Sequence, residues 1–141
     1  MHPEGLFSGL NALPMLGWLA LALAPVQRTL SIAFARILVL LLAVAYLAQL
    51  FLTAVPVDGG GFTSLAGVTA AFSVPANVML GWTHYLAFDL FIGSWETEDA
   101  AANGVPHWLL LPCLFLTAMV GPVGLLLYFA VKFGKQRFFP A

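Results

Sequence analysis

The feature that most restricts how this chain can fold is a long apolar run, TLSIAFARILVLLLAVAYLAQLFL, in which Arg36 is the only charged residue. About 20 apolar residues in a helix cross the roughly 30 Å hydrocarbon core of a bilayer, so this run predicts a transmembrane helix. The whole chain has the same character: 62% of its 141 residues are hydrophobic, 8% are charged, and the mean hydropathy is +0.99. We therefore expect an integral membrane protein rather than a soluble domain.

Hydropathy predicts four transmembrane helices, at residues 6–24, 29–52, 77–95 and 106–131. Pro25 and the turn-forming VPVDGGG end the first two, and ETEDAAANG is expected to be a polar loop between the last two. The segment FTSLAGVTAAFS is too short to cross a bilayer, but its large apolar residues share one helical side, which predicts a short interfacial helix. The expected fold is all-α: a single domain over residues 1–141, with four transmembrane helices and an interfacial helix between the second and third.

The few charged residues bear on orientation and partners. Four spans would place both termini on one face with Lys132, Lys135 and Arg137, and would leave Arg28 and the acidic loop on the other. The positive-inside rule then predicts cytoplasmic termini. No positively charged region precedes the first apolar run, so we expect a retained helix rather than a signal peptide. A net charge of -1 offers no basic surface for nucleic acid, and membrane lipids are the expected partners.

The third predicted span carries polar side chains in its middle. One seam of this helix would face protein, because an arc of about 80° contains Trp82, Tyr85, Asp89, Gly93 and Glu96. A lipid-facing aspartate costs on the order of 2.5–3.5 kcal/mol at the centre of a span, so Asp89 needs a partner or a proton. Arg36 lies at a matched depth in the second span, and we expect it to pair with Asp89 about 10 Å below the surface. Such a pair would either fix the helix register or form part of a functional site.

A second polar layer is expected nearer the other surface. His84 lies about 140° around the helix from Asp89, so the two side chains are expected to have different roles. The layer around His84 would include Asn11, Tyr46, Gln49 and Tyr128. Both a packing role and a proton-transfer role are open for His84, because its ordinary titration range suits either.

The fourth predicted span carries a stripe of mostly small residues, which would let a neighbouring backbone approach: Cys113, Thr117, Gly121, Gly124 and Tyr128. Pro122 predicts a kink, because it cannot donate a hydrogen bond to the carbonyl of Ala118. As the only cysteine, Cys113 excludes an intrachain disulfide. The scattered histidines lack the spacing of a metal site, so no metal is expected.

Two long motifs, HYLAFDLFIGSW and PHWLLLPCLFLTAMVGPVGLLLY, together with FSGLNALPMLGW and GFTSLAGV, extend over nearly the whole chain. In these motifs the chain resembles the neoxanthin-synthase family, also called the abscisic-acid-deficient-four-like family. The resemblance implies a small four-helix membrane protein; plant members reside in plastids and are needed to convert violaxanthin, an epoxy-carotenoid, to neoxanthin. In that isomerisation a strained epoxide opens while a proton leaves the neighbouring polyene carbon, which gives an allene and a tertiary alcohol. An acid and a base suffice, and no cofactor is expected.

The resemblance also implies roles for individual residues. Proton exchange with the substrate would involve Asp89, Tyr85 and His84, and substrate binding would involve Trp82, Phe88 and Arg36. If Asp89 is ionised it acts as the base and Tyr85 as the acid, and protonation of Asp89 reverses these roles. Ser94 departs from the family, because a basic residue is expected there. The absence of a transit peptide points to a bacterial inner membrane and leaves the plant substrate open.

Three functions are compatible with these features. The first is acid–base modification of the ring end group of a carotenoid or another isoprenoid, as by a cofactor-independent isomerase. The alternative is a non-catalytic pigment- or lipid-binding subunit of a membrane complex, in which the small-residue stripe contacts a partner or a second copy of the chain. The third is proton transport through the two polar layers.

Overall fold

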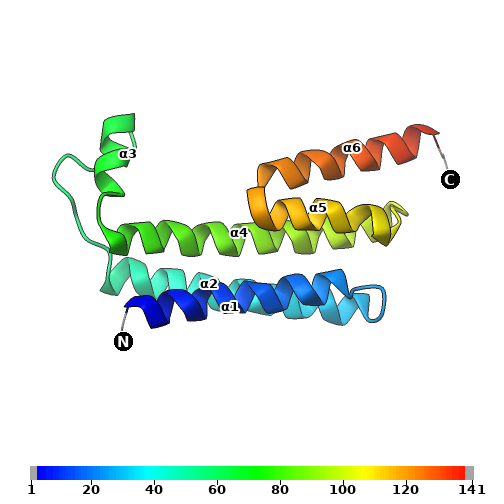
Figure 1. Cartoon of the computed structure of the whole chain (residues 1–141), viewed down its shortest axis with the longest axis horizontal. Helices are drawn as coiled ribbons and strands as arrows, with labels where there is room; N and C mark the ends of the chain where they lie inside the picture. Colours follow the sequence, from blue (N-terminus) through cyan, green and yellow to red (C-terminus); the bar gives the residue numbers. More distant parts are fainter. Residues whose placement is uncertain (1–2, 139–141) are drawn as a thin grey trace.

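A computed structural model describes residues 3–138, and this part of the chain folds into six α-helices without a β-strand (Figure 1). In chain order the helices are α1 Pro3–Ala22, α2 Arg28–Leu52, α3 Leu65–Ala71, α4 Pro75–Ala102, α5 His107–Val120 and α6 Pro122–Phe138. The expectation of an all-α protein is confirmed for the described residues.

The three long helices α1, α2 and α4 lie side by side and form the body of the molecule (Figure 1). Leu21, Leu42 and Leu90, one from each helix, are fully buried in the apolar clusters that join them. Gly93 lets α4 approach α1 closely, because a Cβ at this position would overlap the ring of Trp18. The predicted hairpin of the first two helices is therefore present, and α4 packs against both.

Two helical segments, Glu4–Ala22 and Arg28–Leu52, are long and apolar enough to cross a membrane. A third crossing exists if α3 and α4 count as one span, bent by 104° between Ala71 and Pro75. This search covers the described residues. The apolar helices fit the expected membrane protein, but by length and apolarity only two or three of the described segments could cross, so the predicted four spans are not confirmed.

A short helix is present where an interfacial helix was predicted. Ser64 caps the start of α3 by accepting a hydrogen bond from the backbone N–H of Gly67 at 3.0 Å. Phe62 and Leu65 expose 82% and 83% of their surface. The exposed apolar side chains and the sharp bend away from α4 suit a helix that lies along a membrane surface. Phe72, one of the large apolar residues expected to share that helical side, packs its ring over Gly81 of α4.

The segment predicted as a polar loop, ETEDAAANG, is mostly helical, because α4 continues to Ala102. Its acidic residues are typical of a loop when the sequence is taken alone. In the fold, however, Glu96 and Asp99 find hydrogen-bond donors on α5 and α6. In an exposed loop, water would donate hydrogen bonds to these carboxylates. Here side chains of α5 and α6 donate them instead.

The predicted fourth span is a hairpin of two helices, α5 and α6, which pack against each other and run in opposite directions (Figure 1). The break falls at Gly121, whose φ of 47° lies in the left-handed region that favours glycine. Pro122 begins α6, where its missing N–H removes no helical hydrogen bond, so it starts a helix instead of kinking one. With 14 residues, α5 is about 21 Å long and too short to cross a bilayer alone.

The stripe of small residues joins the two halves of this hairpin. Cys113, Thr117 and Tyr128 are fully buried, and Gly124 lies so close to Thr117 that a Cβ would overlap the backbone of α5. The predicted close approach is present, but the neighbour is the other half of the same segment. Because α6 turns back, it ends at the opposite end of the molecule from the start of α1 (Figure 1). The four predicted spans would instead place the two ends of the chain on one face.

Candidate functional site

Three carboxylates of α4 point toward the α5–α6 hairpin. Asp89 lies at the turn of the hairpin, Glu96 contacts α5, and Asp99 contacts α6. Intervals of seven and three residues place all three on one side of a helix with 3.6 residues per turn. The predicted seam therefore faces protein at Asp89, Gly93 and Glu96, whereas Trp82 near its start is 39% exposed.

Asp89 lies against the turn that joins α5 to α6. A Cβ on Gly121 would lie 3.0 Å from Oδ1 of Asp89, so the carboxylate fits only because this turn residue has no side chain. The other oxygen, Oδ2, is buried and has no hydrogen-bond partner among the described residues. A buried polar atom without a partner costs about 1–3 kcal/mol, and more when it is charged, so this atom is poised to accept a hydrogen bond or a proton.

The start of α6 supplies a positive field near Asp89. Pro122 is the first residue of this helix, directly after the glycine that touches the carboxylate. The N-terminus of a helix carries about half a positive charge, which attracts an anion. The positive group near Asp89 is therefore the start of α6, and not the guanidinium of Arg36 that the sequence predicted.

Arg36 does not pair with Asp89, and this prediction is wrong. Its Nη2 donates to Oε2 of Glu98 at 2.5 Å, and its Nε donates to Oγ of Ser94 at 3.4 Å. The prediction failed because α4 continues beyond Trp95 and brings Glu98 to the depth of the guanidinium. Asp89 lies nine residues earlier, about 13.5 Å along the helix and out of reach.

Glu96 is fully buried and is held by a single donor. The hydroxyl of Thr117 lies 3.0 Å from Oε1 and 3.1 Å from Oε2 of Glu96. One hydroxyl donates one proton, so the two carboxylate oxygens share it. This contact fastens the last turn of α5 to α4 about two helical turns from Asp89.

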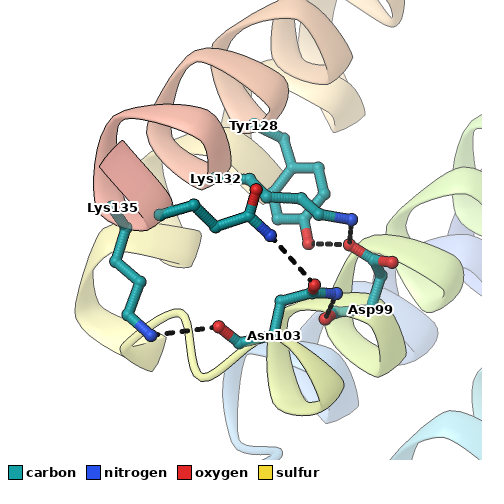
Figure 2. Close-up of polar contacts among 6 residues, drawn as sticks. Asp99, Asn103, Tyr128, Lys132 and Lys135 are labelled. Atoms are coloured by element: carbon teal, nitrogen blue, oxygen red, sulfur yellow. Dashed lines mark hydrogen bonds and ion pairs between the residues drawn. The ribbon is translucent and has the colours of Figure 1, made fainter. Parts of the chain in front are cut away.

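One oxygen of Asp99 has two donors on α6, as Figure 2 shows. Its Oδ2 accepts hydrogen bonds from the hydroxyl of Tyr128 at 2.5 Å and from Nζ of Lys132 at 2.6 Å. One turn further along α4, the backbone carbonyl of Asn103 accepts from Nζ of Lys135 at 3.1 Å. The sequence analysis placed Tyr128 in the layer of His84, near the opposite surface, and the turn at Gly121 is what moves it beside Asp99.

Two aromatic side chains precede Asp89 on its own side of α4. The rings of Trp82 and Tyr85 stack with centroids 5.2 Å apart. Trp82 also donates from Nε1 to Oδ1 of Asn11 on α1 at 3.0 Å, and Phe7 of α1 lies 6.4 Å from it between ring centroids. The structure therefore brings Trp82, Tyr85 and Asp89 into one row, with Tyr85 one turn before the carboxylate.

His84 and Phe88 lie on another side of α4. Their rings stack at 4.4 Å, and the imidazole lies 5.9 Å from the ring of Tyr46 on α2. Tyr46 therefore lies next to His84, as expected for the predicted layer. Nearby, Gln49 donates to the hydroxyl of Thr83 at 3.0 Å in the interior. Asn11 lies at this depth too, where it accepts from Trp82 on another side of α4, whereas Tyr128 has its partner at the other end of that helix.

Grooves line the body of the molecule on two sides. One groove of about 610 Å³ runs between α1 and α4 and includes Phe7, Met79 and Trp82. Another, of about 640 Å³, is bounded by α2, α4 and the segment between α2 and α4, and includes Tyr46 and His84. Apolar surface dominates both, which suits a hydrophobic ligand. Asp89 lines neither groove, although Trp82 connects the first groove to the row of Tyr85 and Asp89.

The described residues contain no group of three or more His, Cys, Asp or Glu side chains placed to hold a metal ion. With a phenol and a carboxylate one helical turn apart, the row of Trp82, Tyr85 and Asp89 carries groups suited to proton transfer. A carboxylate and a hydroxyl are a common acid–base combination in proteins.

The fold and this site define a class: a small all-helical membrane protein that keeps carboxylates in an apolar body and has open apolar grooves. The family model described as ABA DEFICIENT 4-like matches residues 5–128, and the chain belongs to this ABA4-like family. The resemblance inferred from the motifs is thereby confirmed. The family is associated with neoxanthin synthesis, which gives the chain a carotenoid-related function. No curated protein and no solved structure matches the chain.

The sequence analysis missed the attachment of the hairpin to α4. Glu96 was recognised as part of the seam but not as a partner of Thr117, and Asp99 was left in a loop. A signal was available, because Asp99 continues the same helical side as Asp89 and Glu96. This spacing is informative only if the helix continues beyond Trp95, and hydropathy alone does not predict such an extension.

Proposed function

We propose that the protein isomerises a carotenoid ring end group by acid–base chemistry centred on Asp89. The single observation that carries this proposal is the free Oδ2 of Asp89, a buried acceptor inside an apolar body. Ionisable groups at membrane depth usually have a function, because their burial is otherwise unfavourable. The two other carboxylates on this side of α4 have donors of their own and hold the fold together.

In the proposed step, Asp89 acts as the base and Tyr85 as the acid. The C–O bond of the epoxide breaks, and its oxygen takes a proton from the phenol. The electron pair of a C–H bond on the neighbouring polyene carbon forms the new double bond of the allene, and its proton goes to the carboxylate. Proton return from Asp89 to Tyr85 restores both groups, so substrate and product are isomers and the step needs no oxidant or reductant.

The aromatic row suits the rest of such a substrate. Trp82 forms one end of the groove between α1 and α4, and its ring stacks on Tyr85. A polyene lying in this groove would pass Phe7 and Trp82 before its end group reaches Asp89. His84, Phe88 and Arg36 lie apart from this row, so in this proposal they neither exchange protons with the reacting end group nor contact it.

The test is pigment analysis in a bacterial host that accumulates epoxidised and simple cyclic carotenoids. Wild-type protein should produce an isomer with an allene, and both Asp89→Asn and Tyr85→Phe should lose this conversion while still accumulating in the membrane. Asp58→Asn is the matched control, because it removes an exposed carboxylate from a loop and should leave the conversion unchanged. Unchanged pigments with every substrate would contradict the proposal.

A non-catalytic pigment-binding role is the second candidate, and the open grooves favour it. Both large grooves are apolar and accessible from the surroundings, yet neither is lined by Asp89. Under this alternative, purification in mild detergent yields protein with a bound chromophore, and Asp89→Asn retains it. A pigment that stays chemically unchanged in both preparations would favour binding over catalysis.

A further inference from the structure

All basic residues of the protein lie at one end of the molecule. The chain has five Lys and Arg residues, and every one is in the described part. Arg28 and Arg36 are at the start of α2, and the other three are in the second half of α6: Lys132, Lys135 and Arg137. Because α6 turns back at Gly121, these two groups lie at the same end of the molecule instead of at opposite ends (Figure 1).

Contacts between distant segments define this end of the body. Arg28 and Arg36 line a groove of about 410 Å³ together with Glu98 and Ala101, from the last turns of α4. Lys135 reaches the carbonyl of Asn103 at the end of α4. The ring of His107 at the start of α5 lies 2.9 Å from the carbonyl of Ala22 at the end of α1. We call the end of the molecule that carries Arg28, Arg36, Lys132, Lys135 and Arg137 the basic end.

The opposite end of the body is acidic. It is formed by the start of α1, the segment between α2 and α3, and the start of α4 (Figure 1). Its charged side chains are Glu4 and Asp58, and all Lys and Arg residues are elsewhere. At the basic end the remaining carboxylates are engaged, since Glu98 pairs with Arg36 and Asp99 pairs with Lys132. Arg28 and Arg137 are exposed, so this end presents positive charge outward.

We propose that the basic end lies at the cytoplasmic face of the membrane, against anionic phospholipid headgroups, and that the start of α1 lies on the other face. Lys and Arg near the ends of spans determine orientation by the positive-inside rule, and here they are all on one side. Anionic lipids of the cytoplasmic leaflet attract such cations. The two ends of the described chain are then on opposite faces, with three crossings by α1, α2 and the bent α3–α4 pair.

The α5–α6 hairpin is re-entrant under this proposal. It enters from the cytoplasmic face, turns at Gly121 beside Asp89, and returns to the same face. Irregular backbone at membrane depth is tolerated only where protein covers it, and Gly121 is buried against α4.

Single cysteines report the side on which each end lies. The variants Asp58→Cys at the acidic end, Gln27→Cys in the turn between α1 and α2, and Gln136→Cys on α6 all use exposed positions. Wild-type protein is the control, because its native Cys113 is fully buried. In intact bacterial cells, a membrane-impermeant maleimide should label only the cysteine at 58. The cysteines at 27 and 136 should be labelled only after the cells are opened.

Each other pattern overturns the proposal. Labelling at 58 and 136 but not at 27 would mean that the last segment crosses the membrane. Labelling at 27 and 136 but not at 58 would mean the reverse orientation. Labelling at all three positions would mean that the two ends do not lie on different faces of the membrane.

A charge test then isolates the electrostatic cause. The combined change of Arg28, Lys135 and Arg137 to Gln, made in the Gln27→Cys protein, should allow part of the population to be labelled at 27 in intact cells. The charge-preserving control Arg28→Lys with Arg137→Lys should keep this position protected. In reconstituted vesicles, phosphatidylglycerol should raise the melting temperature relative to phosphatidylcholine, and 1 M salt should remove the difference. Full protection at 27 in the neutralised variant, or equal melting in both lipids, would contradict the role of these cations.

Discussion

Asp89 and Asp99 lie on the same side of α4 and face the same hairpin, but their surroundings are opposite. Asp99 accepts a phenol hydrogen bond and an ammonium hydrogen bond from α6. Asp89 lies against the turn of that hairpin, and its Oδ2 has no hydrogen-bond partner among the described residues. The comparison shows that depth along one helix separates a carboxylate that holds the fold from one that is free to react.

The largest expected effect is on the free carboxylate. Asp89→Asn should lower carotenoid conversion by about 100-fold to 10,000-fold, the usual contribution of a general base. Thermal stability in detergent should stay equal or rise, because the change removes a buried charge without a donor. Chromatography of pigments and a melting curve on the same preparation check both. If Asp89→Asn lowers the melting temperature enough to account for the lost conversion, Asp89 holds the fold as Asp99 does, and the contrast between them is wrong.

The partnered carboxylate should behave in the opposite way. Asp99→Ala should cost about 2–4 kcal/mol in the free energy of unfolding, because it leaves the fully buried Tyr128 and the ammonium of Lys132 without an acceptor. Conversion per folded molecule should be retained. Denaturation followed by tryptophan fluorescence provides the measurement, and an unchanged unfolding midpoint would show that this cluster does not hold the hairpin.

Between these two sites, Glu96 gives an intermediate case. Thr117→Val should cost about 1–3 kcal/mol, because the fully buried carboxylate loses its donor. Glu96→Gln is the matched variant: its amide oxygen can still accept from Thr117, so its melting temperature should be closer to that of the wild type. If both variants melt alike, the hydrogen bond contributes nothing measurable.

The smallest effect is expected for Arg36. Its pair with Glu98 is exposed, with 39% and 54% of the two side chains accessible, and exposed pairs contribute about 0–1 kcal/mol. Arg36→Gln should therefore change stability by less than 1 kcal/mol and leave the Asp89 chemistry intact. Loss of conversion in Arg36→Gln would show that the guanidinium contributes to the reaction at Asp89, which would contradict the separation of the two residues.

Hydropathy and motif spacing predicted the helical hairpin of α1 and α2, the short α3 and the seam of α4 that faces protein. Local pattern suffices for these features, because each depends on residues within one or two helical turns. Hydropathy did not predict the end of α4, because it treats the acidic ETEDAAA as a polar loop although Ala and Glu are good helix formers. In the fold, Thr117, Tyr128 and Lys132 supply donors to its carboxylates from later in the chain.

The α5–α6 hairpin depends on the backbone conformation of one residue, Gly121, and a hydropathy scale carries no information about conformation. The run from Pro106 to Val131 has the length and apolarity of a single span, and Pro122 inside it is typical of a kink. The structure differs because Gly121 adopts positive φ, which reverses the chain and places Pro122 at a helix start. The pairing of Arg36 was missed for the same kind of reason, because its depth was compared with a helix that actually continues for two further turns.

The fold-back of α6 underlies the whole contrast between the two carboxylates, and one cross-linking measurement tests it. A carbodiimide joins a carboxylate to an amine only when they are in contact, so treatment of wild-type protein in its membrane should link Asp99 to Lys132, which lie 2.6 Å apart. Mass spectrometry should find this cross-linked peptide in the wild type and not in Lys132→Arg, which keeps the charge but removes the reactive amine. Absence of the link in the wild type, or coupling of Lys132 to Asp58, would show that the last segment crosses the membrane and would contradict the account.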